Sequence, residues 1–256
     1  MNGNLPIILQ DGSTVGTSKP NCRMDVVETE LEVVDELLPV RIGVRNGTAK
    51  LADIAPMARE LSSKIADVGL RHFKRNGKTI PCRKGCASCC HYIVVLTAPD
   101  AFRLVEEVHK MLPQRRKEVK KSFRKANEWF EQHPGKFQRA DGAPGSDNLR
   151  YPCPFLDNNQ CTIYENRPII CREWMVTGTE QNCREDKKVR RLVPSVHIGD
   201  VLRQLAARLE DKSCEDVTLP ALFEWYSQNI KRSKRVWPAK LVVEQFLEIL
   251  KNHVSN

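Results

Sequence analysis

The sequence is organised by a run that places four cysteines within nine residues: Cys82-Arg83-Lys84-Gly85-Cys86-Ala87-Ser88-Cys89-Cys90. The whole chain has ten cysteines in 256 residues, so this density is far above an even spread. Metal coordination requires several thiolates to converge within about 2.3 Å of one centre. A loop that folds back after two or three residues achieves this, and Gly85 permits such a turn. The run therefore predicts half of a metal site, carried on a loop.

Cys89 and Cys90 are adjacent, and two adjacent thiols in an extended segment do not easily bind one small ion. Either they serve two metals, or one is a ligand while the other packs against the protein. His91 follows directly. It either joins the site or forms a hydrogen bond beside it.

A second group of thiols lies further along the chain. Cys153 stands between two prolines, Cys161 and Cys171 enclose Thr-Ile-Tyr-Glu-Asn-Arg-Pro-Ile-Ile, and Cys183 follows twelve residues later. Proline fixes the backbone φ angle and therefore stiffens this segment. The arrangement is typical of a site assembled from distant pieces of the chain.

Taken together, these motifs resemble the CxxCxxCC cysteine-cluster family, which is described as a zinc- or iron-chelating domain and includes the flagellin lysine N-methylases. The resemblance covers about residues 82–172, roughly a third of the chain. The three-residue gap between the first two cysteines is a spacing that some members share. The resemblance implies metal ligation by seven thiols: Cys82, Cys86, Cys89, Cys90, Cys153, Cys161 and Cys171. Cys183 is a further candidate, as an optional eighth ligand.

The metal itself is not determined by the ligand type, because all-thiolate ligation suits zinc, iron and iron–sulfur clusters. Structural zinc sites usually use two short cysteine pairs, and the irregular spacing here favours iron–sulfur or a multinuclear site. The spacing of Cys82, Cys86 and Cys89 is also that of radical S-adenosylmethionine enzymes. Those enzymes carry an aromatic residue where this chain has Ser88, and they need alternating strands and helices that the flanks lack.

Four polar residues in the stretch 164–172 allow two interpretations. Arg167 and Arg172 either compensate thiolate or carboxylate charge, with Tyr164 and Glu165 as structural neighbours, or bind a substrate anion. A four-thiolate site around a divalent ion is negatively charged, so arginines are expected there on electrostatic grounds alone. Cys22 and Cys214 lie outside the motifs and are expected to be ordinary thiols.

The composition is that of a globular protein, with 41% hydrophobic and 29% charged residues. No apolar run approaches the roughly 18–20 residues of a membrane span, and the start does not resemble a signal peptide. We therefore expect a cytoplasmic protein with reduced thiols, in which clustered cysteines bind metal. The net charge of +9 favours anionic partners such as nucleic acid or an acidic protein. Its spread over several basic runs is equally typical of solvated helix faces.

The predicted fold class is mainly α with a small N-terminal β hairpin. Asn46-Gly47 is a type I′ turn signal, which predicts that 39–45 pairs with 48–52. Apolar periodicity predicts helices at 53–75, after Thr97, from Pro113, and at about 197–211, 219–232 and 238–253. Glycines and prolines predict a loop at 134–152.

These elements suggest an N-terminal segment (1–52), a cysteine-cluster domain (53–195) and a C-terminal helical segment (196–256) packed on the same domain. The first hypothesis for function is a metal-binding cysteine-cluster protein of unassigned activity. The family resemblance adds an S-adenosylmethionine-dependent protein lysine N-methylase, although no glycine-rich nucleotide loop follows a strand. The charge adds a basic adaptor that binds nucleic acid or an acidic partner.

Overall fold

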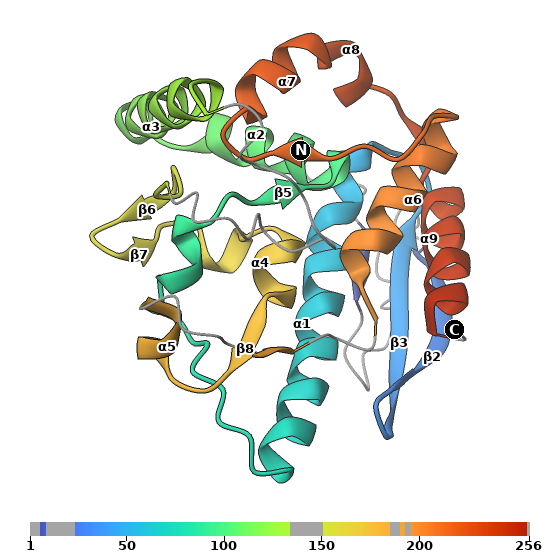
Figure 1. Cartoon of the computed structure of the whole chain (residues 1–256). Coiled ribbons are helices and arrows are strands. Elements are labelled where there is room, and N and C mark those ends of the chain that lie inside the picture. Colours follow the sequence, from blue (N-terminus) through green and yellow to red (C-terminus); the bar gives the residue numbers. More distant parts are fainter. Residues whose placement is uncertain (1–5, 9–23, 134–150, 185–189, 193–195, 255–256) are drawn as a thin grey trace.

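The computed structural model describes residues 6–8, 24–133, 151–184, 190–192 and 196–254 (Figure 1). Cys22 and nearly all of the predicted loop at 134–152 lie outside these residues. Helices dominate, and a small antiparallel sheet lies near the N-terminus. The predicted fold class is therefore confirmed. None of the described helices is both long enough and apolar enough to cross a membrane.

The sheet is built on a hairpin of β2 (Met24–Val33) and β3 (Glu36–Arg45), with β1 (Ile7–Ile8) on the other edge of β3. The turn pairs Val33 with Glu36, and Val34 adopts a positive φ of 58°. Alternate residues of both strands are buried on one face. The alternation of apolar and polar residues over ten positions fixes this register.

The hairpin predicted at Asn46-Gly47 is wrong. β3 pairs with β2 instead, and β4 (Thr48–Ala49) pairs with β11 (Trp237–Pro238) near the C-terminus. A type I′ turn needs a positive φ near 60° at both central residues. Gly47 has a φ of 140° and Asn46 does not have a positive φ. The dipeptide therefore ends β3 and leads into the first helix, which begins at Leu51.

The predicted long helices are present, with small shifts at their ends. α1 (Leu51–Arg75) begins two residues early, so Asp53 is not its N-cap but accepts a hydrogen bond of 2.9 Å from the backbone N–H of Lys50. Thr97 caps α2 (Ala98–Lys110) by accepting from the N–H of Asp100 at 3.4 Å. The remaining long helices are α3 (Pro113–Glu131), α6 (Ile198–Glu210) and α9 (Ala239–Val254). The helix predicted at 219–232 is instead divided at Asn229 into two short helices, the first of which is α7 (Leu222–Gln228).

Two apolar clusters hold these elements together. The first joins the hairpin to α1, α6 and α9, with Ile42, Leu61 and Phe246 fully buried. The second joins α2, α3 and α7 to β5 (Val95–Leu96) and β10 (Val217–Thr218). Burial of this apolar surface at about 25 cal/mol per Å² is the main stabilising contribution. Cys153, Cys161 and Cys171 pack against the edge of the second cluster.

Short elements fill the space beside α1 and below α2 in Figure 1. They carry five of the eight clustered cysteines and are connected by loops. In chain order they are η1 (Ser88–His91), β6 (Leu156–Asp157), β7 (Gln160–Cys161), η2 (Tyr164–Asn166), α4 (Ile169–Glu173), β8 (Met175–Thr177), α5 (Glu180–Arg184) and β9 (Arg190–Leu192). α8 (Ile230–Ser233) follows α7.

Candidate metal centre

The first cysteine run folds back on itself as its spacing predicts. The N–H of Cys86 donates to the carbonyl of Arg83 at 3.1 Å, and Gly85 has a φ of +90° that favours glycine. The chain then forms the single turn η1, in which the N–H of Cys90 donates to the carbonyl of Ala87 at 2.9 Å. The thiols of Cys89 and Cys90 hydrogen-bond to each other. A helical turn rather than an extended segment therefore carries the adjacent pair.

The second group of thiols is joined to the first by the backbone. The N–H of Cys153 donates to the carbonyl of Cys90 at 2.7 Å, and the N–H of Tyr151 donates to the carbonyl of His91 at 2.9 Å. These two bonds align residues 151–153 beside η1. The two halves of the candidate site are thus held together by hydrogen bonds that do not depend on a metal.

A tight hairpin brings Cys161 back towards Cys153. β6 and β7 pair Leu156 with Cys161, and the turn between them places Asn158 and Asn159 at φ angles of 47° and 58°. Asparagine tolerates this left-handed conformation better than other non-glycine residues. This Asn-Asn pair is a turn signal that the sequence analysis missed.

Cys171 lies on α4, which is held by a buried carboxylate. Oδ2 of Asp100 accepts from the N–H of Ile169 at 3.0 Å, at the first turn of α4. Oδ1 of Asp100 accepts from Arg59 of α1 at 2.9 Å, and both side chains are almost completely buried. Neither residue was a candidate in the sequence, although an arginine within the apolar stripe of α1 was a usable signal. The pair connects α1, α2 and α4 behind Cys171.

Cys183 lies on α5, which contacts η1. Two links hold this segment near the first cysteine run. The N–H of Gly178 donates to the carbonyl of Thr79 at 2.9 Å, and Arg83 forms an ion pair of 3.0 Å with Glu180. They explain why a thiol twelve residues after Cys171 comes back to the same region.

All eight clustered cysteines are therefore brought into one region, with Cys89 at its centre. Cys82, Cys86 and Cys89 lie close enough to Cys183 for their thiolate charge to raise its pKa. Thiolate charge on Cys89 likewise raises the pKa of Cys153, Cys161 and Cys171. Cys90 bonds to Cys89. Cys214 is exposed and takes no part in these interactions.

Two opposing effects set the thiol pKa values. Burial raises the pKa of Cys153 and Cys171 far above that of a free thiol, and it raises that of Cys82 and Cys161 as well. Backbone N–H groups act the other way, because a donor stabilises the thiolate. Phe155 donates to Cys153, Ile163 to Cys161, and Val176 to Cys82. The sulfurs are thus protonated without metal but surrounded by donors suited to thiolates.

Arg167 is the principal positive charge at the thiols. It lowers the pKa of Cys82, Cys89, Cys161 and Cys171. Its guanidinium stacks on the ring of Tyr164, 4.1 Å from the ring centroid, and Lys84 lies 5.4 Å from the same centroid. Within the described part of the chain, its buried Nε has no hydrogen-bond partner. Arg167 therefore faces the thiols and is available to compensate their charge.

Arg172 has a different role. It donates to Oγ of Ser63 at 2.8 Å, to the carbonyl of Arg167 at 3.1 Å, and to the carbonyl of Glu165. These bonds fasten the turn of η2 to α1. Glu165 in turn pairs with Lys84 of the first cysteine run at 2.7 Å. Arg172 thus positions the Arg167 loop through backbone carbonyls.

The side chains as they stand do not yet form a coordination sphere. Among the described residues, no three His, Cys, Asp or Glu side chains converge in a way that holds a metal ion. The donor chemistry nevertheless fits a thiophilic metal, because the region gathers sulfurs from several segments, three of which accept a backbone N–H and four of which are influenced by Arg167. Rotation of a cysteine about χ1 redirects its sulfur without moving the backbone.

Comparison with known families agrees with the sequence motifs. Residues 81–191, somewhat less than half of the chain, match the CxxCxxCC family model, described as a "Putative zinc- or iron-chelating domain". The match contains all eight clustered cysteines. No curated protein and no solved structure matches the chain. The resemblance to this family is confirmed, and its description supports metal binding without distinguishing zinc from iron.

Proposed function

We propose that the protein binds zinc or iron, the latter as single ions or as an iron–sulfur cluster, through its eight clustered thiols. The observation that carries this proposal is the meeting of four separate segments, 82–90, 151–161, 169–173 and 180–184, around Cys89. Chance packing does not commonly bring so many thiols together in a protein that forms no disulfide among them. The proposed ligands are Cys82, Cys86, Cys89, Cys90, Cys153, Cys161, Cys171 and Cys183.

Eight thiols are enough for two four-thiolate sites. The electrostatic contacts fall into two groups that share Cys89: Cys82, Cys86 and Cys183 in one, and Cys153, Cys161 and Cys171 in the other. This division supports the interpretation in which the adjacent cysteines serve two metals, one thiol for each. A turn of 3-10 helix directs consecutive side chains about 120° apart, which suits ligands for two neighbouring centres.

The charge balance of the region supports the same proposal. Four thiolates around a divalent ion leave two negative charges, which are costly beside an apolar cluster unless they are compensated. Arg167 lowers the pKa of four of the thiols, and Lys84 lies near the Tyr164 ring on which Arg167 stacks. The structural interpretation of these basic residues is thus favoured over a substrate-binding one.

A bound metal would mainly supply cross-links between short segments. η1, β6, β7, α4 and α5 are each two to five residues long, too short to be stable alone. Coordination would tie them to one another and to α1 through Asp100 and Arg172. No observation on the described residues favours the lysine N-methylase alternative, and no catalytic residue is assigned.

The test is metal analysis of protein expressed with both zinc and iron and purified without oxygen. We expect about two zinc ions per chain in a colourless protein, or stoichiometric iron in a brown one. Cys171→Ser should lose metal, whereas Cys214→Ser, which changes an exposed thiol outside the region, should retain it. Metal-free wild-type protein from such a preparation would refute the proposal.

A further inference from the structure

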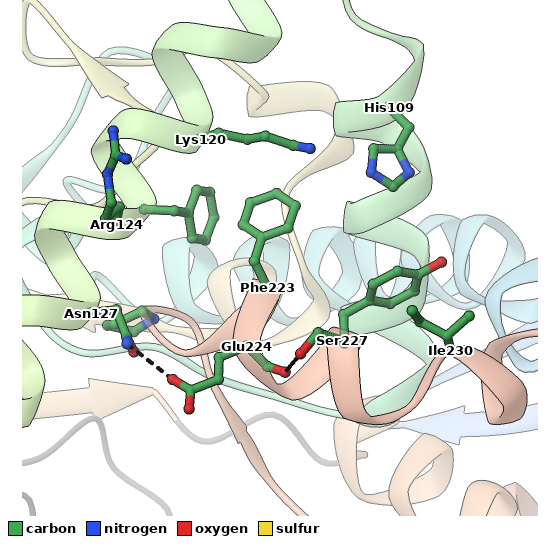
Figure 2. A pocket seen from close by; sticks show the side chains of 11 residues that line it. His109, Lys120, Arg124, Asn127, Phe223, Glu224, Ser227 and Ile230 are labelled. Carbon is green, nitrogen blue, oxygen red and sulfur yellow. Dashed lines mark hydrogen bonds between the residues drawn. The ribbon is translucent and has the colours of Figure 1, made fainter.

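A pocket lies between α2, α3 and α7, outside the cysteine region (Figure 2). Its volume is about 390 Å³. His109 contributes from α2, Lys120 and Arg124 from α3, and Phe223 and Tyr226 from α7. Nothing in the proposed metal function uses this pocket.

A basic groove adjoins the pocket along α3. It has a volume of about 360 Å³ and is lined by five cations and Pro113. These cations recur every three or four residues, so they form one stripe along the helix. From Arg116 to Arg124 the stripe is about 12 Å long at 1.5 Å per residue. Lys120 and Arg124 line both hollows, so the groove leads into the pocket.

No ion pair within the described part of the chain neutralises the charge of this stripe. Among the described residues, Lys117, Lys120, Lys121 and Arg124 form no ion pair, and the groove has no acidic lining residue. Their side chains are exposed. Arg116 differs, because it donates to the carbonyl of His109 at 2.9 Å. The stripe therefore presents a continuous positive surface to an anionic ligand.

The pocket adds an aromatic wall to this charge. The ring of Phe223 packs edge-on against Phe123 with centroids 4.9 Å apart, and Nζ of Lys120 lies 5.6 Å from its centroid. Tyr226 packs edge-on against His109 at 6.2 Å. The rings are thus fixed by packing before any ligand arrives, which reduces the entropy cost of binding.

The other titratable groups of the pocket define its polarity. Burial and the charges of Lys120 and Arg116 lower the pKa of His109, so that it is neutral at pH 7. Glu224 is the one carboxylate of the lining, and it accepts from Nδ2 of Asn127 at 3.1 Å. Figure 2 shows Glu224 below Phe223, with Lys120 on the other side of that ring. A polyanion is therefore drawn to the α3 side of the pocket.

We propose that this surface binds single-stranded nucleic acid, with phosphates along the α3 stripe and a base against the aromatic wall. Five cations over about 12 Å exceed what one phosphate group requires, whereas they suit successive phosphodiesters. Aromatic rings stack unpaired bases without regard to sequence, and the half-buried rings of Phe223 and Tyr226 line the pocket. A duplex keeps its bases stacked inside and cannot use the pocket, and an acidic peptide has no base to place there.

The test is fluorescence anisotropy of the full-length protein with a labelled oligothymidylate over a range of salt concentrations. Wild-type binding should weaken as salt rises from about 50 to 200 mM. The double variant Lys120→Ala with Arg124→Ala removes two exposed contacts and should lower the slope of log K against log salt by about 1.4. Phe223→Leu keeps an apolar side chain in the cluster and should weaken oligothymidylate binding several-fold.

Two comparisons make the outcome decisive. Lys74→Ala with Lys78→Ala removes two exposed cations at the far end of α1, and should leave binding unchanged. Heparin, a polyanion without bases, should bind Phe223→Leu as well as it binds the wild type. The proposal is wrong if oligothymidylate does not bind at low salt, if both double variants weaken it equally, or if Phe223→Leu affects heparin and oligothymidylate alike. A duplex or poly-glutamate that binds better than the single strand would also overturn it.

Discussion

The backbone N–H of Cys153 lies 2.7 Å from the carbonyl oxygen of Cys90 and donates a hydrogen bond to it. The bond joins the two halves of the cysteine motif directly, through atoms that are not metal ligands. The protein therefore holds its thiol segments in register before coordination, and a metal has mainly to redirect side chains. Such preorganisation lowers the entropy cost of binding.

Replacement of a single proposed ligand should lower the melting temperature. Cys86→Ser should reduce that of the metal-loaded protein by roughly 5–10 °C. A ligand present at 100 times its dissociation constant contributes about 2.7 kcal/mol, and each kcal/mol shifts a chain of this size by about 2–4 °C. Differential scanning calorimetry measures the shift. Cys214→Ser is the matched control, and an unchanged curve for Cys86→Ser would show that this thiol is not a structural ligand.

Asp100 is predicted to matter for stability and for metal retention at once. Asp100→Asn keeps an oxygen for the N–H of Ile169 but removes the charge opposite Arg59, which is 4% exposed. Because a buried charge is left partly unpaired, the free energy of unfolding measured in urea should fall by about 3 kcal/mol. Metal should also dissociate faster, because α4 carries Cys171. Glu36→Gln, at an exposed pair with Arg71, should change neither quantity. Equal behaviour of the two variants would contradict this account of α4.

Metal binding should release protons. Burial raises the pKa of Cys153 and Cys171, so both thiols are protonated near neutral pH, whereas a metal binds the thiolate. Apparent affinity should therefore rise with pH, and fall as pH drops. Titration calorimetry in two buffers of different ionisation enthalpy measures the number of protons released. Identical heats in both buffers would mean that these thiols are not ligands.

Arg167 is predicted to tune metal affinity through its charge. Arg167→Gln removes the cation that lowers the pKa of Cys89 and Cys171. Loss of an outer-shell partner typically weakens metal binding by about 10–100-fold, which competition with a chromogenic chelator measures. Arg208→Gln changes an arginine that pairs with Glu248 at 3.1 Å on the surface and serves as the control. If the Arg167→Gln variant binds metal with unaltered affinity, Arg167 does not influence the metal site.

The long helices could be predicted from the sequence because each carries its own apolar periodicity. The face of α1 that contains Ile54, Met57, Leu61, Ile65 and Val68 is buried as its spacing indicates. Strand pairing could not be predicted in the same way. A local turn signal at Asn46-Gly47 competed with the long β2–β3 register, and the pairing of β4 with β11 depends on residues at opposite ends of the chain.

In the candidate site, too, features set by local sequence could be predicted, whereas contacts between distant residues could not. The eight cysteines stood out by spacing, and the structure brings all of them together. The contact of Asp100 with Ile169 depends on tertiary packing, which a motif does not encode. The aromatic wall beside the basic helix was equally hidden, because Phe223 is distant in sequence from Lys120.

X-ray absorption at the zinc or iron edge of the purified protein tests the central claim most directly, since it reports the atoms bound to the metal. The account predicts about four sulfur neighbours at about 2.3 Å, for zinc or for iron. Cys153→Ser should reduce the sulfur count. A first shell made mainly of oxygen or nitrogen at about 2.0–2.1 Å would show that the thiols do not hold the metal.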